Sequence, residues 1–461
     1  MPRFNFYLIL FVLFVYALTA GVTLRDRLLI STLHRIERNA YVEPSAKDLF
    51  EGAMAGMAEV LSDKFGDGYS LYVPPGRQMD YRDLLENQYE GLGLSIRLHE
   101  EGEEKKFLIG YPYHDSPAYR AGLRSGDQVL QIDGVSVADK AKDEFFKLLR
   151  QQERSEIILS VLPFGEIIPK DFLVRRERIH FDSVEGDYCD SDGRVFCLET
   201  YPKIGYVRIT SFSTTTAKEF GNALERMMQS GAESFILDLR NNPGGDVWNC
   251  IQVVRMLIAP NSGGNVIVMS QYRAWQFRRG YFNLIEGTQR CILPMVVLIN
   301  GESASSTEIL AAALQDHQRA TIVGTRSFGK GVIQGIFDLP FQSGILQLTD
   351  SEYRRPNGTP IHRKTNAADS DDWGITPDKI IETSETEQSA VEEYRLLRSN
   401  ILSVQRLAVL EQFRQQITVK QNNENKKEAL EQKQFEFTGT APYYDLQLDE
   451  AIKILLGNNE Q

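Results

Sequence analysis

Residues 234–246 read Ser-Phe-Ile-Leu-Asp-Leu-Arg-Asn-Asn-Pro-Gly-Gly-Asp. The run from Ser234 to Leu239 is almost continuously apolar and has the length of one β-strand, which predicts a strand buried on both faces. The Pro-Gly-Gly turn ends that strand, and a segment with helical character follows it. The stretch therefore predicts a strand–turn–helix unit of an α/β fold.

The same order recurs across residues 178–380. Apolar runs of strand length occur at 204–209, 295–299 and 321–323, and segments with helical periodicity lie at 217–228 and 307–314. Connections long enough to hold a helix imply right-handed crossovers between strands of one sheet. We therefore expect residues 178–380 to form an α/β domain with a mixed sheet and packed helices.

Residues 89–177 form a second predicted unit that is dominated by strand and turn signals. It opens with Gly91-Leu92-Gly93-Leu94 and continues through Ser116-Pro117-Ala118 and the segment 126–134, which reads Gly-Asp-Gln-Val-Leu-Gln-Ile-Asp-Gly. This series resembles a PDZ domain. A glycine-rich turn can offer backbone N–H groups to a terminal carboxylate, and the adjoining strand edge can accept an extended peptide. We expect Gly91, Leu92, Gly93 and Leu94 to bind peptide, the alternative being a simple tight turn.

The N-terminal segment contains 21 consecutive residues without a charge, from Phe4 to Leu24. About 20 apolar residues span a bilayer as a helix, so residues 1–27 are predicted to be a retained membrane anchor. A cleaved signal sequence is the alternative, because Val15-Tyr16-Ala17 would serve as a cleavage site. Both interpretations place the body of the chain outside the cytoplasm, in the periplasm or its equivalent, and residues 4–24 are the expected anchor to the inner membrane.

The segments on either side of these domains are predicted to be helical. Apolar residues recur at three- and four-residue spacing through residues 28–88. Residues 381–461 form a C-terminal extension, with an amphipathic helix expected from Glu385 to Ile417. A polar stretch at 421–434 follows, and an apolar pattern returns near the end of the chain.

The composition excludes some partners. The formal net charge is −12 and no long basic run occurs, which argues against nucleic acid as a partner. The four cysteines, Cys189, Cys197, Cys250 and Cys291, allow three disulfide pairings, among them a staple between Cys189 and Cys197, but free thiols fit equally well. The spacing of cysteines and histidines predicts no metal site, and no cofactor is implied. A homo-oligomer is possible.

Two further turns carry candidate chemistry besides the one at Gly244 and Gly245. Residues 300–309 read Asn-Gly-Glu-Ser-Ala-Ser-Ser-Thr-Glu-Ile, and residues 324–334 read Gly-Thr-Arg-Ser-Phe-Gly-Lys-Gly-Val-Ile-Gln. Taken alone, Ser305 with Glu308 fits a capping box at a helix start. Taken alone, Gly324–Gly331 approaches a phosphate-binding loop, but glycine stands where the serine or threonine for magnesium should be.

Together, these three segments resemble the carboxyl-terminal processing peptidase family, also called tail-specific proteases. The resemblance covers roughly residues 35–380 and a short piece near Asp445. It implies a crotonase-like protease core with Ser305 as nucleophile, Lys330 as its base and Gln334 as a supporting residue. It also implies an oxyanion hole made by the backbone N–H groups of Gly244 or Gly245 and of Ser306. The family usually has Ser-Ala-Ser-Ala-Ser-Glu where this chain has Ser-Ala-Ser-Ser-Thr-Glu, so Ser306 is a second candidate hydroxyl.

The chemistry of the residues supports these roles. A serine hydroxyl needs a neighbouring base to become a good nucleophile. Lysine can be that base only if burial lowers its pKa from about 10.4 toward neutrality. From Thr325 to Phe337 the chain has no Asp or Glu, which suits a desolvated lysine. The sequence therefore predicts a serine endopeptidase acting on proteins with accessible C-termini, the alternative being an inactive PDZ scaffold at the membrane.

Overall fold

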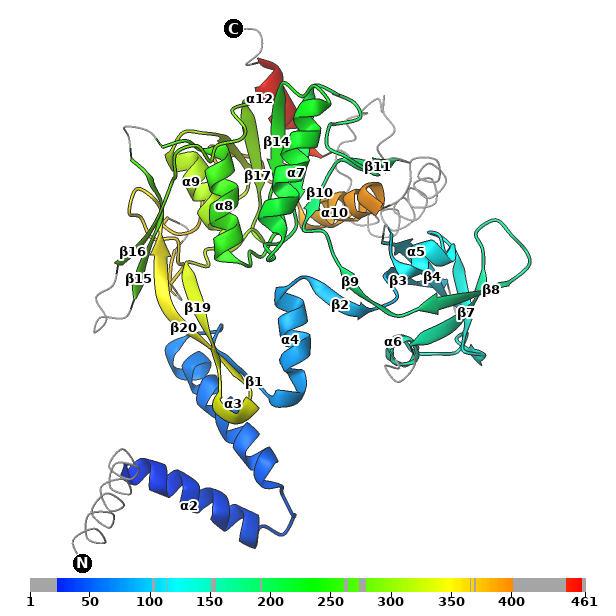
Figure 1. Ribbon diagram of the computed structural model, residues 1–461, viewed down its shortest axis with the longest axis vertical. Coiled ribbons are helices and arrows are strands. Elements are labelled where there is room, and N and C mark those ends of the chain that lie inside the picture. The colour runs from blue at the N-terminus through cyan, green and yellow to red at the C-terminus, as the bar shows by residue number, and fades with distance from the viewer. Residues whose placement is uncertain are drawn as a thin grey trace, which may run out of the picture. The chain divides into compact units, whose positions relative to one another are not determined.

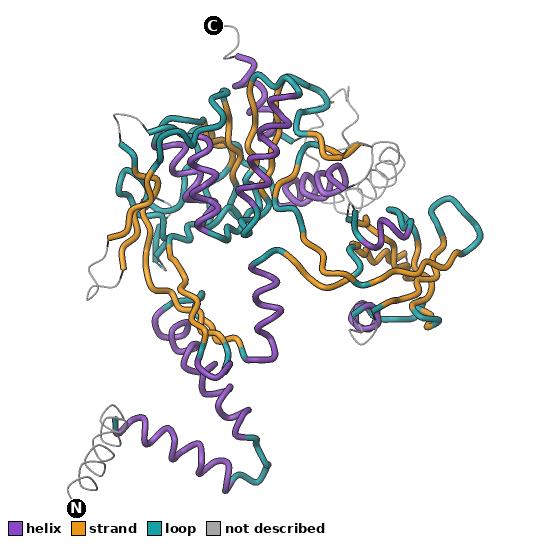
Figure 2. The backbone as a smooth tube through the Cα atoms, viewed as in Figure 1, coloured by secondary structure: helices purple, strands orange, loops and turns teal. Residues whose placement is uncertain are grey.

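The computed structural model describes residues 23–400 and 445–457, except for short gaps at 102–103, 114, 151–154, 191–192, 261–263, 273–278, 365 and 369. The chain divides into two compact units (Figures 1 and 2). One unit contains the residues up to Met79 together with Gln334–Asp350, and the other contains Asp80–Ile333 together with the residues from Ser351 onward.

The first unit combines N-terminal helices with a β-hairpin. Its elements are α2 (Leu24–Asn39), α3 (Ala46–Phe65), β1 (Leu71–Val73), η1 (Pro75–Arg77), most of β19 (Val332–Asp338), η2 (Pro340–Gln342) and the first part of β20 (Ile345–Arg354). Ser45 caps α3, and Gly66 ends it in the left-handed conformation. Strand β1 pairs antiparallel with β20, with Leu71 opposite Gln347. The helices predicted here are confirmed.

The second unit begins with a small β-rich region that follows α4 (Gln78–Leu85). Its main sheet has the order β3-β4-β5-β7-β8, with β6 paired to β5. The bounds are β3 (Leu94–Glu101), β4 (Glu104–Pro112), α5 (Pro117–Ala121), β5 (Gln128–Ile132), β6 (Val135–Ser136), α6 (Lys142–Leu149), β7 (Glu156–Leu162) and β8 (Lys170–Arg175). The rings of Phe107 and Phe145 stack in its core with centroids 3.9 Å apart. The strand-rich character predicted for this region is confirmed.

The chain enters and leaves this region through two paired strands, β2 (Gln88–Gly91) and β9 (Glu177–His180). They run antiparallel, with Tyr89 opposite Ile179.

A six-stranded sheet forms the centre of the second unit, in the order β10-β13-β14-β17-β18-β21. Its strands are β10 (Val184–Glu185), β13 (Ile204–Ile209), β14 (Ser234–Asp238), β17 (Met295–Ile299), β18 (Thr321–Gly324) and β21 (Lys379–Ile380). Within this sheet β13, β14, β17, β18 and β21 run parallel to one another, and β10 pairs antiparallel with β13. Every residue of β13, β14 and β17 is buried, so the predicted strands covered on both faces are confirmed.

Helices cover both faces of this sheet. Alternate strand residues such as Phe235 and Leu237 pack on α7 (Thr216–Gln229), α8 (Val247–Leu257) and α9 (Ser306–Asp316). The intervening residues, such as Ile236, pack on α12 (Leu446–Gly457). Figure 1 shows α7, α8 and α9 standing along the sheet. The fold is therefore a mixed α/β domain, as predicted.

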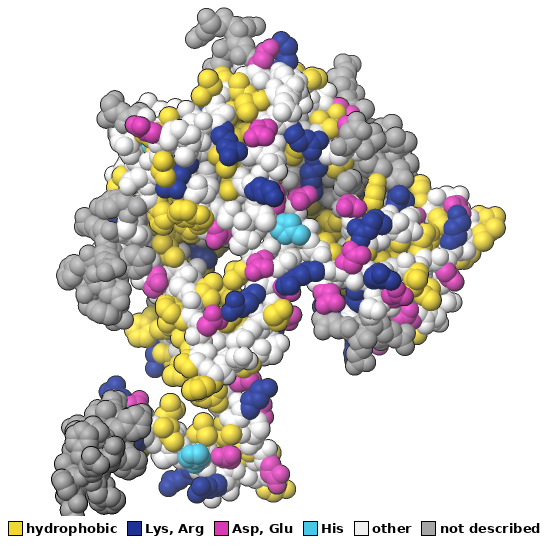
Figure 3. Space-filling view, viewed as in Figure 1, with side chains coloured by type: hydrophobic (Ala, Val, Ile, Leu, Met, Phe, Trp, Pro, Cys, Tyr) yellow, Lys and Arg dark blue, Asp and Glu magenta, His cyan; other side chains and the backbone are white. Residues whose placement is uncertain are grey.

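Smaller elements complete the second unit. A hairpin of β11 (Tyr188–Asp190) and β12 (Gly193–Val195) precedes β13, while β15 (Val266–Tyr272) pairs with β16 (Arg279–Asn283) and with the end of β20. Helix α10 (Glu385–Asn400) confirms the start of the predicted C-terminal helix. The remainder of that helix and the polar stretch at 421–434 lie outside the described residues. Acidic and basic side chains are interspersed over the face seen in Figure 3.

The sequence left two questions open, the state of the cysteines and the role of the apolar N-terminal run. All four cysteines are buried thiols. In the β11–β12 hairpin Cys189 lies opposite Arg194. Cys197 lies beyond the hairpin and forms a backbone β-bridge with Gly205. The strand register therefore does not place Cys189 opposite Cys197. Almost all of the run from Phe4 to Leu24 lies outside the described residues, and within those residues no helix is long and apolar enough to span a membrane.

Candidate active site

Ser305 lies in the turn between β17 and α9 and has an unusual backbone conformation. Its φ is 59° and its ψ is −122°, a region that residues with a side chain rarely occupy and that is typical of strained functional turns. Two hydrogen bonds fix this turn to the glycine turn: the N–H of Ala304 and the hydroxyl of Thr307 both donate to the carbonyl oxygen of Asn242, at 3.0 and 3.1 Å. The strand end thus presents Ser305 at the N-terminus of α9.

The neighbouring serines have structural partners. Ser306 is fully buried and its hydroxyl donates to the carbonyl oxygen of Gly245 at 2.7 Å. Ser303 is also fully buried and donates to the carbonyl oxygen of Leu239 at 2.8 Å. Of the three, Ser305 is partly exposed and the other two are buried, so among them only the hydroxyl of Ser305 is accessible.

The turn at Gly244 and Gly245 packs directly against Ser305. A Cβ atom on Gly244 would lie 2.7 Å from the Cβ of Ser305 and 2.9 Å from the backbone nitrogen of Ser306. A Cβ atom on Gly245 would lie 2.1 Å from the carbonyl oxygen of Phe212. Both glycines also have positive φ, 96° and 137°. Only glycine therefore allows this turn to approach the serine.

The two glycine amides differ in their partners. The N–H of Gly244 donates to Oδ1 of Asn242 at 2.8 Å. The N–H of Gly245 donates to no described residue within hydrogen-bond distance. Among the described residues, the amide of Gly244 is therefore engaged and that of Gly245 is not.

Glu308 joins the turn that carries Ser305 to the segment that carries Lys330. One oxygen of its buried carboxylate, Oε2, accepts from the N–H of Ser305 at 2.9 Å and from the N–H of Lys330 at 2.8 Å. The other, Oε1, accepts from the hydroxyl of Ser327 at 2.6 Å and from the N–H of Gly329 at 2.7 Å. Two segments separated by more than twenty residues therefore meet on one side chain.

The electrostatics of Glu308 follow from this burial. Burial raises the pKa of Glu308 to about 7, and the four hydrogen bonds oppose that rise. Each carboxylate oxygen already accepts two hydrogen bonds, so a proton could bind only by displacing a donor. The capping-box pattern predicted the bond from the N–H of Ser305 but not the bonds from the segment 327–330. The N–H of Glu308 donates to the carbonyl oxygen of Ser305, at 2.8 Å.

Lys330 is partly buried, and burial lowers its pKa while the charge of Glu308 opposes that change. The burial agrees with the predicted desolvated lysine, but the absence of acids holds only along the sequence, because Glu308 approaches Lys330 in the fold. The fold brings the first turn of α9 against the lysine segment, and Glu308 comes with it. The backbone of Lys330 is also held from the other side, where its carbonyl oxygen accepts from the hydroxyl of Tyr353.

Gln334 belongs to the first unit and is described there. Its Nε2 donates to the hydroxyl of Thr349 at 3.3 Å, and that hydroxyl donates to Oδ1 of Asp67 at 2.8 Å. The amide nitrogen is thereby engaged, which leaves the amide oxygen as the acceptor that Gln334 could offer.

The predicted peptide-binding turn, Gly91 to Leu94, connects β2 to β3. The carbonyl oxygen of Leu92 accepts from the N–H of Ala118 at 2.9 Å, and that of Gly93 accepts from the hydroxyl of Ser116 at 2.7 Å. The turn is therefore fixed to the start of α5. Among the described strands, β3 lies at the end of its sheet and has β4 as its single neighbour.

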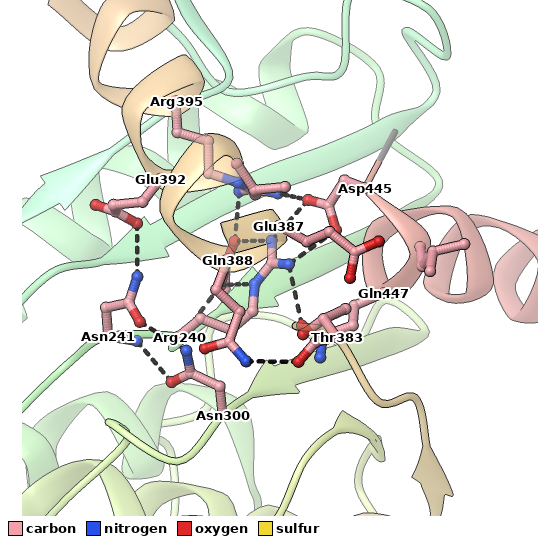
Figure 4. Close-up of a pocket in the computed structure, with 13 residues that line it drawn as sticks. Arg240, Asn241, Asn300, Thr383, Glu387, Gln388, Glu392, Arg395, Asp445 and Gln447 are labelled. Carbon is pink, nitrogen blue, oxygen red and sulfur yellow. Dashed lines mark hydrogen bonds and ion pairs between the residues drawn. The ribbon is translucent and has the colours of Figure 1, made fainter. Parts of the chain in front are cut away.

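Asp238, Arg240 and Asn242 hold the glycine turn through hydrogen bonds of their side chains. Asp238 accepts from Nε and the backbone N–H of Arg240, at 2.9 and 3.1 Å. Figure 4 shows Arg240 with Arg395 and Asp445 in a pocket at the ends of β14 and β17. Arg240 and Arg395 each pair with both Asp238 and Asp445, so these ion pairs connect the end of β14 to the C-terminal segment.

Comparison with known proteins agrees with these features. Residues 203–381 match peptidase family S41, and residues 108–163 match the PDZ domain. A carboxyl-terminal-processing protease of Synechocystis sp. is 35% identical over 345 residues, which are 75% of this chain and 74% of that protein. A carboxy-terminal-processing protease of Bartonella bacilliformis is 32% identical over 354 residues, 75% of this chain and 72% of that protein.

Solved structures share the fold. An S41 protease structure from Bacteroides fragilis superposes with a TM-score of 0.51 at 17% identity, covering 84% of this chain and 97% of that one. The core, the PDZ region and the sequence relatives all lead to one conclusion. The chain belongs to the carboxyl-terminal processing proteases of peptidase family S41.

Proposed function

We propose that this chain is a serine endopeptidase in which Ser305 is the nucleophile and Lys330 is the general base. The observation that carries the proposal is the double hydrogen bond to Oε2 of Glu308, which brings the backbones of Ser305 and Lys330 together. The partial burial of Lys330 adds to it, because burial lowers the pKa of the lysine and so favours the neutral amine that a base requires. Gln334 remains a prediction from sequence as the residue that supports the lysine.

The mechanism begins when Oγ of Ser305 attacks the carbonyl carbon of a peptide bond and its proton passes to Nζ of Lys330. The negative charge that develops on the carbonyl oxygen is stabilised by the N–H groups of Gly245 and Ser306. The positive end of α9 adds to that stabilisation. The C–N bond then breaks, and the leaving amine takes the proton from Lys330.

The acyl group is then bound to Ser305 as an ester. Water attacks this ester and gives its proton to Lys330, and the C–O bond to Ser305 breaks as the hydroxyl recovers that proton. The products are two peptides, one with a new C-terminus and one with a new N-terminus. The enzyme returns to its starting state without a cofactor.

Recognition is proposed to depend on the PDZ region, taken as residues 89–177. A substrate tail would add as a strand to the open edge of β3 and place its terminal carboxylate at Gly91–Leu94. The match to the PDZ domain and the end position of β3 in its sheet support this role.

The decisive experiment compares single variants of the purified chain on an unfolded protein that ends in apolar residues. Ser305→Ala and Lys330→Ala should each lower the rate of cleavage by at least about 10³-fold. Ser306→Ala should keep measurable cleavage, since its hydroxyl is engaged by Gly245. If Ser306→Ala lost as much cleavage as Ser305→Ala, the assignment of Ser305 as the nucleophile would be contradicted.

An inactive PDZ scaffold is the competing function. It predicts that tails bind to the chain but that no cleavage occurs under any condition. Retained tail binding with no new C-terminus detected by mass spectrometry would favour the scaffold.

We also propose that residues 4–24 direct the chain out of the cytoplasm, as a retained anchor or as a cleaved signal sequence. The uncharged run of 21 residues supports this. In carbonate extraction, an anchored chain stays with the membrane, and a cleaved chain is released without its first residues. Recovery of the intact chain from the cytoplasm would overturn the proposal.

A further inference from the structure

The peptide-binding turn already holds a hydroxyl group of its own chain. The N–H of Gly93 donates to the phenol oxygen of Tyr89 at 3.0 Å. Gly93 has a φ of 73°, and a Cβ there would lie 2.3 Å from Cβ of Ser116, so this amide is fixed in place against α5. Tyr89 therefore occupies one of the few N–H groups that the turn can offer to a ligand.

The ring of Tyr89 reaches this position because Gly91 has no side chain. A Cβ atom on Gly91 would lie 2.2 Å from Cε2 of Tyr89. The ring stacks on Phe181 with centroids 5.1 Å apart and an interplanar angle of 7°. Phe181 in turn meets the edge of Tyr113 at 4.5 Å. The phenol is thus held over the turn by an aromatic cluster made of Tyr89, Phe181 and Tyr113.

The phenol remains neutral at this site. Burial raises the pKa of Tyr89, while hydrogen bonds from the backbone of Gly93 and Leu94 oppose the rise. A neutral phenol oxygen is a weaker acceptor than a carboxylate, because hydrogen bonds to charged groups are about twice as strong. An arriving carboxylate could therefore take over the N–H groups from the phenol.

We infer that the phenol of Tyr89 is an internal occupant of the carboxylate site, which the C-terminus of a substrate must displace in order to bind. The inference rests on the proposed recognition of tails by Gly91–Leu94. It adds that, in the chain without a bound tail, the phenol of Tyr89 occupies the N–H of Gly93.

The displacement has a path toward the protease domain. Tyr89 lies on β2 and Phe181 directly follows β9, the two strands through which the chain enters and leaves the PDZ region. Two residues after Phe181, the N–H and the hydroxyl of Ser183 donate to Glu219 of α7, at 2.7 and 2.8 Å. Movement of Tyr89 would therefore break its contact with Phe181, two residues before the hydrogen bonds that join Ser183 to Glu219 of α7.

The test measures peptide binding to the full chain carrying Ser305→Ala, with and without Tyr89→Phe. The probes are a ten-residue peptide that ends in apolar residues with a free carboxylate and the same peptide as its C-terminal amide. Tyr89→Phe keeps the ring and removes the oxygen, so the N–H of Gly93 becomes available. We expect the variant to bind the free acid roughly two- to tenfold more tightly, which corresponds to one neutral hydrogen bond. Binding of the amide should not change.

Tyr113→Phe is the matched control, because it removes another hydroxyl of the same aromatic cluster, one whose hydrogen-bond partner is Tyr111. It should bind the acid as tightly as the parent chain does. If Tyr89→Phe binds the acid equally or more weakly while the parent prefers acid to amide, the inference is overturned and tail recognition stands. If no variant distinguishes acid from amide, tail recognition itself fails, and this inference fails with it.

Discussion

Glu308 determines the geometry at the scale of single residues, although it is not one of the proposed reacting groups. Its two oxygens accept four hydrogen bonds, two of them from the backbones of Ser305 and Lys330. Because the carboxylate is fully buried, water cannot replace it if it is removed. The position of the lysine segment therefore depends on this one side chain.

Glu308→Gln tests that dependence. An amide keeps one acceptor oxygen and turns an NH₂ group toward the remaining donors, so two of them lose their partner. We expect cleavage to fall by at least about 100-fold and the free energy of unfolding to fall by about 2–3 kcal/mol. Glu302→Gln, on the exposed part of the same turn, is the control and should leave both quantities unchanged. Full activity in Glu308→Gln would show that the carboxylate does not position the site.

The two titrating groups also predict how activity depends on pH. Lys330 must lose its proton to act as a base, and burial lowers its pKa. Glu308 must be ionised to accept its four hydrogen bonds, and its pKa is about 7. We therefore expect kcat/KM to rise as the pH increases through about 7, measured with a peptide that has no titrating group near that pH. A decline over the same range would contradict the assignment.

Stability should change in the opposite direction from activity. The pKa of Glu308 is raised from 4.5 in the unfolded chain to about 7 in the fold. Its protonated form is therefore favoured by folding, and this contribution is fully present below about pH 4.5 and lost as the pH rises through 7. In urea unfolding, the difference in stability between the parent and Glu308→Gln should be larger at pH 5 than at pH 8. If the difference in stability were the same at pH 5 and pH 8, the raised pKa of Glu308 would be refuted.

The sequence identified the segments that meet around Glu308, but not the contacts between them. Ser305 and Lys330 stand in distinctive segments, and the capping-box spacing placed Glu308 next to the backbone of Ser305. The contact between Glu308 and Lys330 depends on how β17, α9 and β18 pack, and no local pattern encodes that packing. For the same reason, the absence of Asp and Glu from residues 325–337 did not reveal that Glu308 lies close to Lys330.

At the scale of elements, the turn after β14 depends on Gly245. A Cβ atom at this position would lie 2.1 Å from the backbone oxygen of Phe212, and the φ of 137° is itself unfavourable for other residues. Gly245→Ala should therefore displace the turn and abolish cleavage. Gly231 provides the control, because it has a φ of 85° but nothing within 4 Å of a new Cβ.

Gly231→Ala should cost about 1–2 kcal/mol of stability, from the backbone alone, and keep full activity. Thermal unfolding and cleavage measured on both variants separate the two effects. If Gly245→Ala cleaved as well as Gly231→Ala, the close approach to Phe212 would not matter to the site.

Elements were predictable where burial is complete. The runs at 204–209 and 295–299 match β13 and β17 at both ends, because strands covered on both faces are uniformly apolar. Strand β20 has the sequence Ile-Leu-Gln-Leu-Thr-Asp-Ser-Glu-Tyr-Arg and is mostly half-buried, without a clear alternation. Its pairing with β1 and β15 is decided by distant segments, which is why the sequence did not predict it.

At the scale of the whole second unit, the C-terminal helix completes the core. Ala451, Ile452 and Leu455 of α12 cover the face of the sheet that α7, α8 and α9 leave open. The start of α12 is fixed by Asp445, whose two oxygens accept from Arg240 at 2.9 and 3.0 Å. The sequence predicted an apolar pattern in this tail, but not a contact between residues 205 positions apart.

Asp445→Asn tests whether this contact supports the glycine turn. Burial alone would raise the pKa of Asp445, but Arg240 and Arg395 hold it well below its usual range. Removing the charge leaves two buried guanidinium groups with Asp238 alone, so we expect a loss of about 3–5 kcal/mol. Asp449→Asn is the control: Asp449 lies on α12, is partly exposed and pairs with the exposed Lys453, so the substitution should cost less than about 1 kcal/mol.

The pH dependence of the same variant gives an independent measurement. Because the pKa of Asp445 is depressed in the fold, its contribution to stability is present above about pH 4 and is lost as the pH falls toward the folded value. The parent chain should therefore lose stability on acidification more steeply than Asp445→Asn does. Since Arg240 lies only four residues before Gly244, cleavage should fall in the variant even where it remains folded. A variant that is less stable but cleaves normally would show that the C-terminal helix supports the core without acting on the turn.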